Sequence, residues 1–306
     1  MKTELYINGV GCVSRLKGFE ELLDETHQPN YKELIPAMKL RRMSKVMRMS
    51  NYAALTALSQ ANVEIPQAIN VGTGYGCLVD TEKFLSTLLD NNEEFSNPSA
   101  FINSTHNTLA GSLAILLGAK GQNFTFVHPE NAFENALIDA QMGMDEGSFS
   151  DALLGGVDEK TDILQSLSSH FVDSEIGEGA AFLSVTNKPL GNSKALIKGV
   201  MTDSSKMNET LFLEKFFQEM QLKKTDLDFV LSNAEIGTQS SIIDYKKLIG
   251  DYPTITAFAC AFAATIIERQ QTPLFLKMPE KNINNILVYN RYQNGSQSLI
   301  LISKIA

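Results

Sequence analysis

The sequence is poor in cysteine, in positive charge and in long apolar runs. Its three cysteines, Cys12, Cys77 and Cys260, are far apart and odd in number, which predicts a reducing compartment, the cytoplasm, and no disulfide framework. The formal net charge of −9 disfavours nucleic acid as a general partner. No apolar run approaches the length of a membrane span, and the first residues alternate as a strand. We therefore expect neither a membrane span nor a leader peptide.

What is present is the composition of a globular protein. Of the 306 residues, 43% are hydrophobic and 20% are charged, and this length can bury a sizeable core in one large domain or in two fused halves. Periodicity predicts strands at residues 5–10, 69–76, 124–127, 152–154, 179–185, 195–200, 227–231, 286–289 and 299–302. It also predicts helices at residues 38–61, 80–89, 108–117, 131–147, 208–221 and 254–268.

A strand, sharp turn, helix and strand follow one another between residues 121 and 159. Residues 124–127 alternate as a strand, and His128 and Pro129 break it. Small and apolar residues then recur at spacings of three and four, which predicts a helix ending near Gly147. Such a turn presents a residue at a helix N-terminus, where backbone N–H groups and the macrodipole favour negative charge.

This stretch resembles the nucleophile-elbow region of the β-ketoacyl-acyl-carrier-protein synthases, members of the thiolase-like fold. Those enzymes carry a Gly-Pro-x-Tyr strand, an Ala-Cys-Ala turn, a helix and a strand ending in Gly-Gly-x-Glu, and residues 121–156 follow that pattern without a gap. The nucleophilic Cys of the family falls on Glu130. The resemblance implies an α/β fold of two similar halves in a five-layered α/β/α/β/α arrangement. Glu130 would lie buried at the start of a central helix.

The same resemblance divides the chain and extends into its second part. We expect an N-terminal half over residues 1–200 and a shortened C-terminal half over residues 201–306. Residues 232–244 are similar to the Asn-Ala-His-Gly-Thr motif of the family, and the place of its catalytic His falls on Glu235 or Ile236. The helix expected over residues 254–268 is rich in small residues and is similar to a second motif of the family, and the place of its His falls near Ala259.

The catalytic set of the family cannot be assembled from these motifs. No Cys lies between Cys77 and Cys260, and no His follows His170. Cys77 has no His or Asp at a distinctive nearby spacing, so we interpret it as small apolar filler. Glu130 cannot hold a thioester, and its charge would repel a developing enolate.

Two groups of residues are candidates for ligand and carrier contacts. By resemblance, the ligand contacts would be His106, His128, Glu130, Phe133 and Phe258. Positive charge also gathers at the start of the helix expected over residues 38–61, where the family has a similar Arg-bearing helix: Arg41, Arg42, Lys45 and Arg48. These basic residues form either a solvated helix face or a dock for an acidic acyl carrier protein.

The expected partner surface combines the strand at residues 124–127 with the polar residues 104–107. The family dimerises there by joining sheets edge to edge, and an unpaired apolar edge strand favours association. Helix capping is the plainer interpretation of residues 104–107, ahead of catalysis. If the protein acts by pairing, it should self-associate or require a partner.

Two functions of different classes follow. The first is a non-catalytic subunit similar to the chain-length factors of type II fatty acid, polyketide or polyene systems. It would form a heterodimer with an active ketoacyl synthase, or a homodimer, and would meet an acyl carrier protein. The second is an enzyme of altered chemistry, either a malonyl-carrier decarboxylase or a hydrolase that uses Glu130 with His128. A relic that only keeps the fold is a third possibility. No cofactor or metal is expected in any of them.

Overall fold

The computed structural model describes residues 3–94, 98–168, 175–234, 236–237, 240–278 and 282–305. Ten strands form one mixed sheet: β1 (Leu5–Val13), β4 (Ala68–Thr73), β5 (Gln122–Val127), β6 (Asp151–Asp158), β7 (Gly179–Thr186), β8 (Ala195–Asp203), β9 (Phe229–Ser232), β10 (Ser241–Ile243), β11 (Asn285–Arg291) and β12 (Gln297–Ser303). Two short strands, β2 (Leu16–Lys17) and β3 (Glu21–Leu22), pair separately.

The sheet consists of two sets of five strands with the same internal order. Counted outward from the middle, one set runs β1, β7, β6, β4, β5 and the other runs β8, β12, β11, β9, β10. In each set the strands therefore stand in the chain order first, fifth, fourth, second, third. The sets meet where β1 pairs antiparallel with β8, through Leu5 with Ile197, Tyr6 with Leu196 and Ile7 with Ala195. This repeat confirms the two similar halves. The division at residue 200, which lies within β8, stays a prediction.

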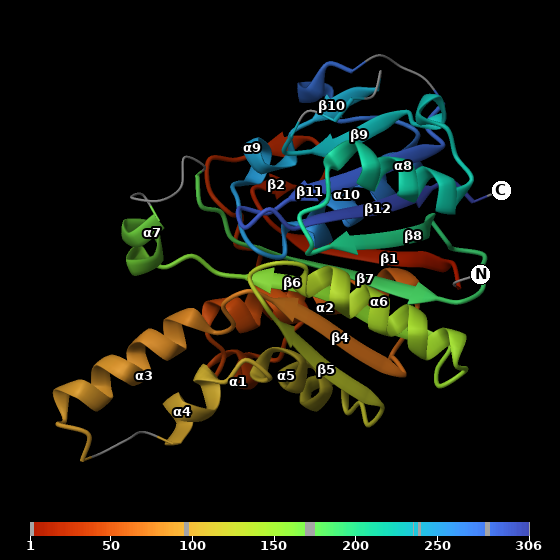
Figure 1. Ribbon diagram of the computed structural model, residues 1–306. Helices are drawn as coiled ribbons and strands as arrows, with labels where there is room; N and C mark the ends of the chain where they lie inside the picture. Colours follow the sequence, from red (N-terminus) through yellow and green to blue (C-terminus); the bar gives the residue numbers. More distant parts are fainter. Residues whose placement is uncertain are drawn as a thin grey trace.

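Helices cover both faces of each set (Figure 1). The longer helices are α2 (Lys45–Ala61), α3 (Leu78–Asp90), α5 (Thr108–Leu117), α6 (Ala132–Asp145), α8 (Glu209–Met220) and α10 (Ile255–Arg269). The shorter helices are α1 (Ala37–Leu40), α4 (Pro98–Ser104), α7 (Asp162–Ser168) and α9 (Tyr245–Ile249). Single 3-10 turns are η1 (Tyr31–Glu33), η2 (Lys224–Asp226) and η3 (Leu274–Leu276). None of the helices described is both long and apolar enough to cross a bilayer.

Alternate side chains along the strands fall into different cores, which defines the five layers. On β6, Leu154 packs into a central core with α6 and α10, whereas Leu153 packs into an outer core with α2 and α5. On β11, Val288 enters the same central core, whereas Leu287 and Tyr289 enter a second outer core under α8. Each half-sheet thus lies between an outer helix layer and the shared central layer of α6 and α10. The thiolase-like arrangement is confirmed.

The helix predicted over residues 38–61 is interrupted. It forms as α1 and α2, and Ser44 is extended at the N-cap of α2. The break lets Leu40 and Met43 both enter the outer core. The capping interpretation of Asn107 is also wrong, because its side chain makes no cap hydrogen bond. At the start of α8, Asn208 does cap its helix, since its Oδ1 accepts from the backbone N–H of Thr210 at 3.0 Å.

Candidate functional site

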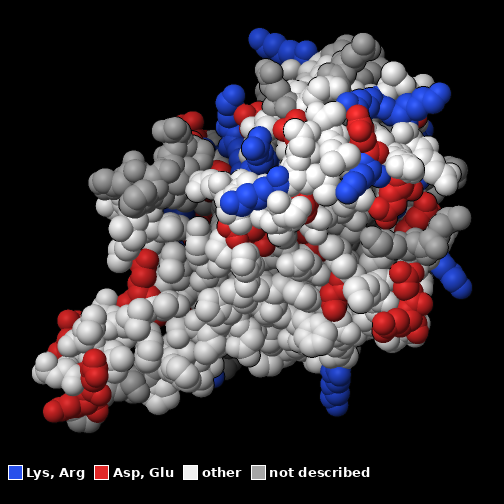
Figure 2. Space-filling model, in the orientation of Figure 1, with Lys and Arg blue, Asp and Glu red and all other residues white. Residues whose placement is uncertain are grey.

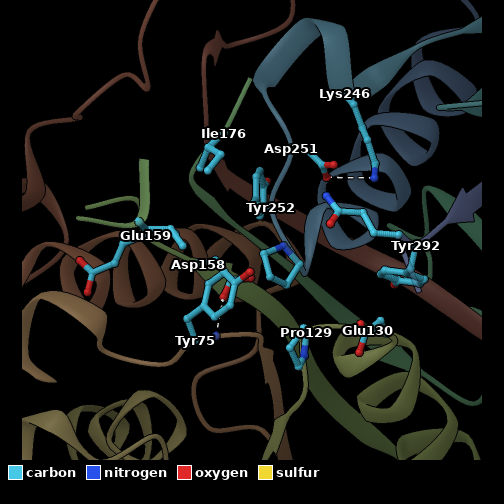
Figure 3. Close-up of a pocket in the computed structure, with 14 residues that line it drawn as sticks. Tyr75, Pro129, Glu130, Asp158, Glu159, Ile176, Lys246, Asp251, Tyr252 and Tyr292 are labelled. Atoms are coloured by element: carbon cyan, nitrogen blue, oxygen red, sulfur yellow. Dashed lines mark hydrogen bonds and ion pairs between the residues drawn. The ribbon is translucent and has the colours of Figure 1, made fainter. Parts of the chain in front are cut away.

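A pocket of about 150 Å3 lies where the ends of elements from both halves converge (Figure 3). The segments after β4 and β5 contribute Tyr75 and Glu130, and the segment before α10 and the β11–β12 turn contribute Tyr252 and Tyr292. Asp158, the last residue of β6, also lines it. The turn predicted from the sequence therefore does face a pocket, and the second half supplies the other side.

Asp158 ties the two halves together beneath this pocket. Its buried carboxyl accepts through Oδ1 from Thr73 Oγ1 at 3.1 Å, Gly74 N at 2.7 Å and Tyr75 N at 3.2 Å. Oδ2 accepts from Thr254 N at 3.0 Å and Thr254 Oγ1 at 2.7 Å. Burial raises the pKa of Asp158, and these donors oppose the shift. The saturated carboxyl acts as a structural joint.

Glu130 is more exposed than expected. Its side chain is 20% exposed, and its Oε2 lies 2.7 Å from Nδ1 of His128, which is itself 62% exposed. The expectation of a buried Glu130 at the helix start is wrong because α6 begins only at Ala132. Asn131 holds the N-cap in the left-handed conformation, at φ 57°. Asn131, at 6% exposure, is the buried residue of this turn.

The start of α6 lies hard against β4. A Cβ added at Gly72 would come within 2.6 Å of the Phe133 backbone nitrogen. Only a residue without a side chain permits this approach. The close packing fixes where the turn at Glu130 emerges relative to Tyr75.

Glu134 is a buried carboxyl that the sequence analysis missed. It lies in the first turn of α6 at 0% exposure, and Tyr292 Oη donates toward its two oxygens at 3.0 and 3.1 Å. Ser298 Oγ donates to Oε1 at 2.7 Å. Burial raises the pKa of Glu134 against the effect of these donors. The sequence did carry a signal for its burial, because Glu134 lies three positions before Leu137 and therefore on the apolar face of the helix.

Glu159 is a second carboxyl that was missed. It is 1% exposed, lines the pocket and accepts from the Val79 backbone N–H of α3 at 3.0 Å through Oε1. Its Oε2 is buried without a hydrogen-bond partner. Burial raises the pKa of Glu159 to about 7, so part of the population holds a proton at neutral pH.

A match to a known protein family shows what the chain is related to. A family model for the N-terminal domain of beta-ketoacyl synthase matches residues 17–194. The chain belongs to the β-ketoacyl synthase family.

Solved structures of the same fold include ketosynthases and chain length factors. The ishigamide ketosynthase/chain length factor is 14% identical, with a TM-score of 0.78 and full coverage of both chains. AntDE:AntF, a type II PKS acyl-carrier protein in complex with its ketosynthase, is 15% identical with a TM-score of 0.79 and full coverage of both. The ketosynthase ApeO in complex with its chain length factor ApeC, from Xenorhabdus doucetiae, is 12% identical with a TM-score of 0.71, covering 99% and 98%. No curated protein sequence matches the chain.

The ligand contacts predicted from the synthase resemblance do not all lie at the pocket. Glu130 lines the pocket. Phe133 and Phe258 do not, because α6 and α10 form the central layer and direct both rings into its core, where Phe258 stacks on Phe262 at 5.6 Å. His106 is exposed and lies against the loop after β4, where a Cβ at Gly76 would come within 2.5 Å of its ring.

The residues at the two positions where the synthases have a catalytic His lie in different parts of the structure. Glu235 lies outside the described residues, whereas Ile236 is 2% exposed in the outer core under α8. Ala259 is buried in the central core. Cys77 and Cys260 are buried too, and burial raises the pKa of both thiols. Neither is poised to act as a thiolate.

The basic residues proposed for docking are not equivalent. Arg41 and Arg42 are exposed between α1 and α2. Arg48 donates to the Leu40 carbonyl at 3.2 Å. The Lys45 ammonium pairs with Glu178, whose side chain is 6% exposed. Arg41 and Arg42 are therefore the better candidates for a partner's carboxylates.

Proposed function

We propose that the protein is a non-catalytic synthase-fold subunit, similar to a chain-length factor, of a cytoplasmic type II fatty acid, polyketide or polyene system. It works as the partner of an active ketoacyl synthase. The observation that carries this proposal is the chemistry of the pocket. Of the described residues that line it, none is Cys or His, and four carry carboxyl groups: Glu130, Asp158, Glu159 and Asp251.

Decarboxylative condensation needs groups of the opposite kind. A thiolate must carry the acyl chain, and hydrogen-bond donors must stabilise the enolate or oxyanion that forms from the malonyl partner. Carboxylates around that position would raise the energy of such an anion. The pocket therefore supports loss of condensing activity.

An apolar edge supports pairing. β5 is the outermost strand of its half, and its Phe124 and Val127 are 49% and 43% exposed. Ile115 of α5 and Phe101 of α4 are exposed at 77% and 55%. In Figure 2 the surface over β4, β5 and α5 carries few charged atoms. An unpaired strand edge beside exposed apolar side chains favours an edge-to-edge partner of the same fold.

Pairing is tested by co-expressing the protein with an active ketosynthase of its own biosynthetic system. We expect a stable one-to-one complex in size-exclusion chromatography with light scattering, or a homodimer when no synthase is present. Phe124→Asp should weaken the complex at least about tenfold, since it places a charge on the edge. Leu211→Asp is the matched control, because Leu211 is 45% exposed on α8 in the other half. A monomer at all concentrations that captures no synthase would remove the pairing proposal.

An acyl carrier protein is the second proposed partner. Arg41 and Arg42 lie exposed at the start of α2, and an acidic carrier would meet them by charge attraction. A charge reversal, Arg41→Glu with Arg42→Glu, should weaken carrier binding to the complex and lower its salt dependence. Equal binding by the reversed variant would contradict this dock.

The contact between His128 and Glu130 favours one alternative function, a hydrolase. The His128 Nδ1 lies 2.7 Å from Oε2 of Glu130, which lines the pocket, and this is within reach for general-base activation of water. Incubation with acyl-carrier thioesters tests it. Thioester hydrolysis that His128→Ala abolishes would favour the hydrolase over the non-catalytic subunit.

A further inference from the structure

The pocket is an acidic cavity with aromatic walls. Among the described residues that line it, Lys246 is the one cationic side chain, and its Nζ lies 2.9 Å from Oδ1 of Asp251. Three other carboxyl groups line it. The pKa of the Tyr75 phenol is raised, first by burial and then by the carboxylates of Asp158, Asp251 and Glu130. Carboxyl groups therefore outnumber cationic groups among the described lining residues, which favours a cationic ligand.

Three tyrosines supply the walls. Tyr75, Tyr252 and Tyr292 come from three separate segments, and Figure 3 shows them spread around the cavity. Burial raises the pKa of all three, so they remain neutral phenols at physiological pH. The faces of such rings attract ammonium groups, most strongly where water is excluded.

One of the carboxyl groups, that of Glu130, remains available to a ligand. Asp158 is saturated by five hydrogen bonds, and Asp251 has its ammonium. Figure 3 shows the Glu159 side chain directed away from Glu130 and Tyr292, and its Oε2 is buried without a hydrogen-bond partner. Glu130 is held by His128 alone among the ion pairs of the described residues, and that histidine reaches it from the exposed side.

We propose that this pocket binds a small organic ammonium group, seated against the tyrosine rings and close to Glu130. A volume of about 150 Å3 suits a head group better than a whole substrate, since pockets for drug-sized ligands measure roughly 300–1,000 Å3. The proposal rests on the interpretation of the pocket as a binding site without condensing chemistry. It is independent of the pairing surface on β5.

Choline and its uncharged isostere 3,3-dimethylbutan-1-ol provide the test, since they differ only in the charged nitrogen. In saturation-transfer NMR titrations, choline should bind saturably and the isostere at least about tenfold more weakly. Glu130→Gln and Tyr75→Leu should each weaken choline binding several-fold. Glu146→Gln, an exposed change at the far end of α6, is the matched control.

Equal binding of the two probes, no binding of choline, or full binding by Glu130→Gln would each overturn the proposal. Circular dichroism checks that Tyr75→Leu still folds. Glu130→Gln tests choline binding a second time, at a partly exposed position. Complex formation with the synthase should be unchanged in Glu130→Gln. A failure of ammonium binding therefore does not bear on the pairing proposal, which the co-expression experiment tests separately.

Discussion

Replacing Glu134 probes a fully buried carboxyl group next to the site. Glu134→Leu removes the acceptor of the Tyr292 and Ser298 hydroxyls, which lie within 3.1 Å of the carboxyl oxygens. Each buried hydroxyl left without a partner costs about 1–3 kcal/mol, so we expect a loss of about 2–6 kcal/mol in the free energy of unfolding. Glu134→Gln keeps an acceptor and the shape, and should lose less.

The pH dependence separates these effects. Burial raises the pKa of Glu134 above its ordinary value of 4.5, so the folded protein keeps a proton that the unfolded chain releases above that pH. Folding then takes up a proton, and this contribution to stability is complete below pH 4.5 and is lost as the pH rises through the folded pKa. Within that window the slope reaches about 1.4 kcal/mol per pH unit.

Urea unfolding of the protein and its variants between pH 4.5 and 9 measures both terms. The advantage of the parent protein over Glu134→Gln should be largest at low pH and should shrink as the pH rises. Glu146→Gln, at an exposed position, should follow the parent curve. If Glu134→Gln keeps the full pH slope of the parent, or if Glu134→Leu is equally stable, the account of a buried protonated carboxyl is refuted.

Three further changes and one control test the packing and capping of the fold. Asp158→Asn turns an amide N–H toward one set of its hydrogen-bond donors, so it should lower the free energy of unfolding by about 2–4 kcal/mol in urea titrations. An unchanged midpoint would contradict the role of Asp158 as a structural joint between the halves. Gly72→Ala places a methyl group 2.6 Å from the Phe133 nitrogen and should cost about 1–3 kcal/mol in thermal melts. Gly111→Ala, with open space around it, should be neutral or stabilising. Asn208→Ala should cost about 1 kcal/mol by loss of its cap, and an equal melting temperature would contradict that cap.

Periodicity predicted most of the fold because each element carries its own signal. The strand at residues 124–127 and the helix at residues 254–268 both formed close to their expected bounds. The break between α1 and α2 was not predicted, because it depends on the outer core that Leu40 and Met43 enter together. A helical pattern cannot show where tertiary packing interrupts it.

The site was harder to predict because its partners are remote in sequence. The turn at Glu130 could be located, since strand, turn and helix are neighbours along the chain. The partners of Glu134 could not be predicted, because Tyr292 and Ser298 lie 158 and 164 residues away in the sequence. The depth of Glu130 was also wrong, since it depends on where the first turn of α6 begins, and helix ends are poorly defined by pattern alone.

The repeated strand order has a consequence for synthesis on the ribosome. All five strands of the first set lie between Leu5 and Thr186, so they can assemble while the second set is still being made. Their inner face and the apolar side of α6 nevertheless share a core with α10, which begins only at Ile255. At about 5–20 residues per second, the nascent half exposes that surface for several seconds. During this interval the exposed apolar surface of the growing chain favours aggregation.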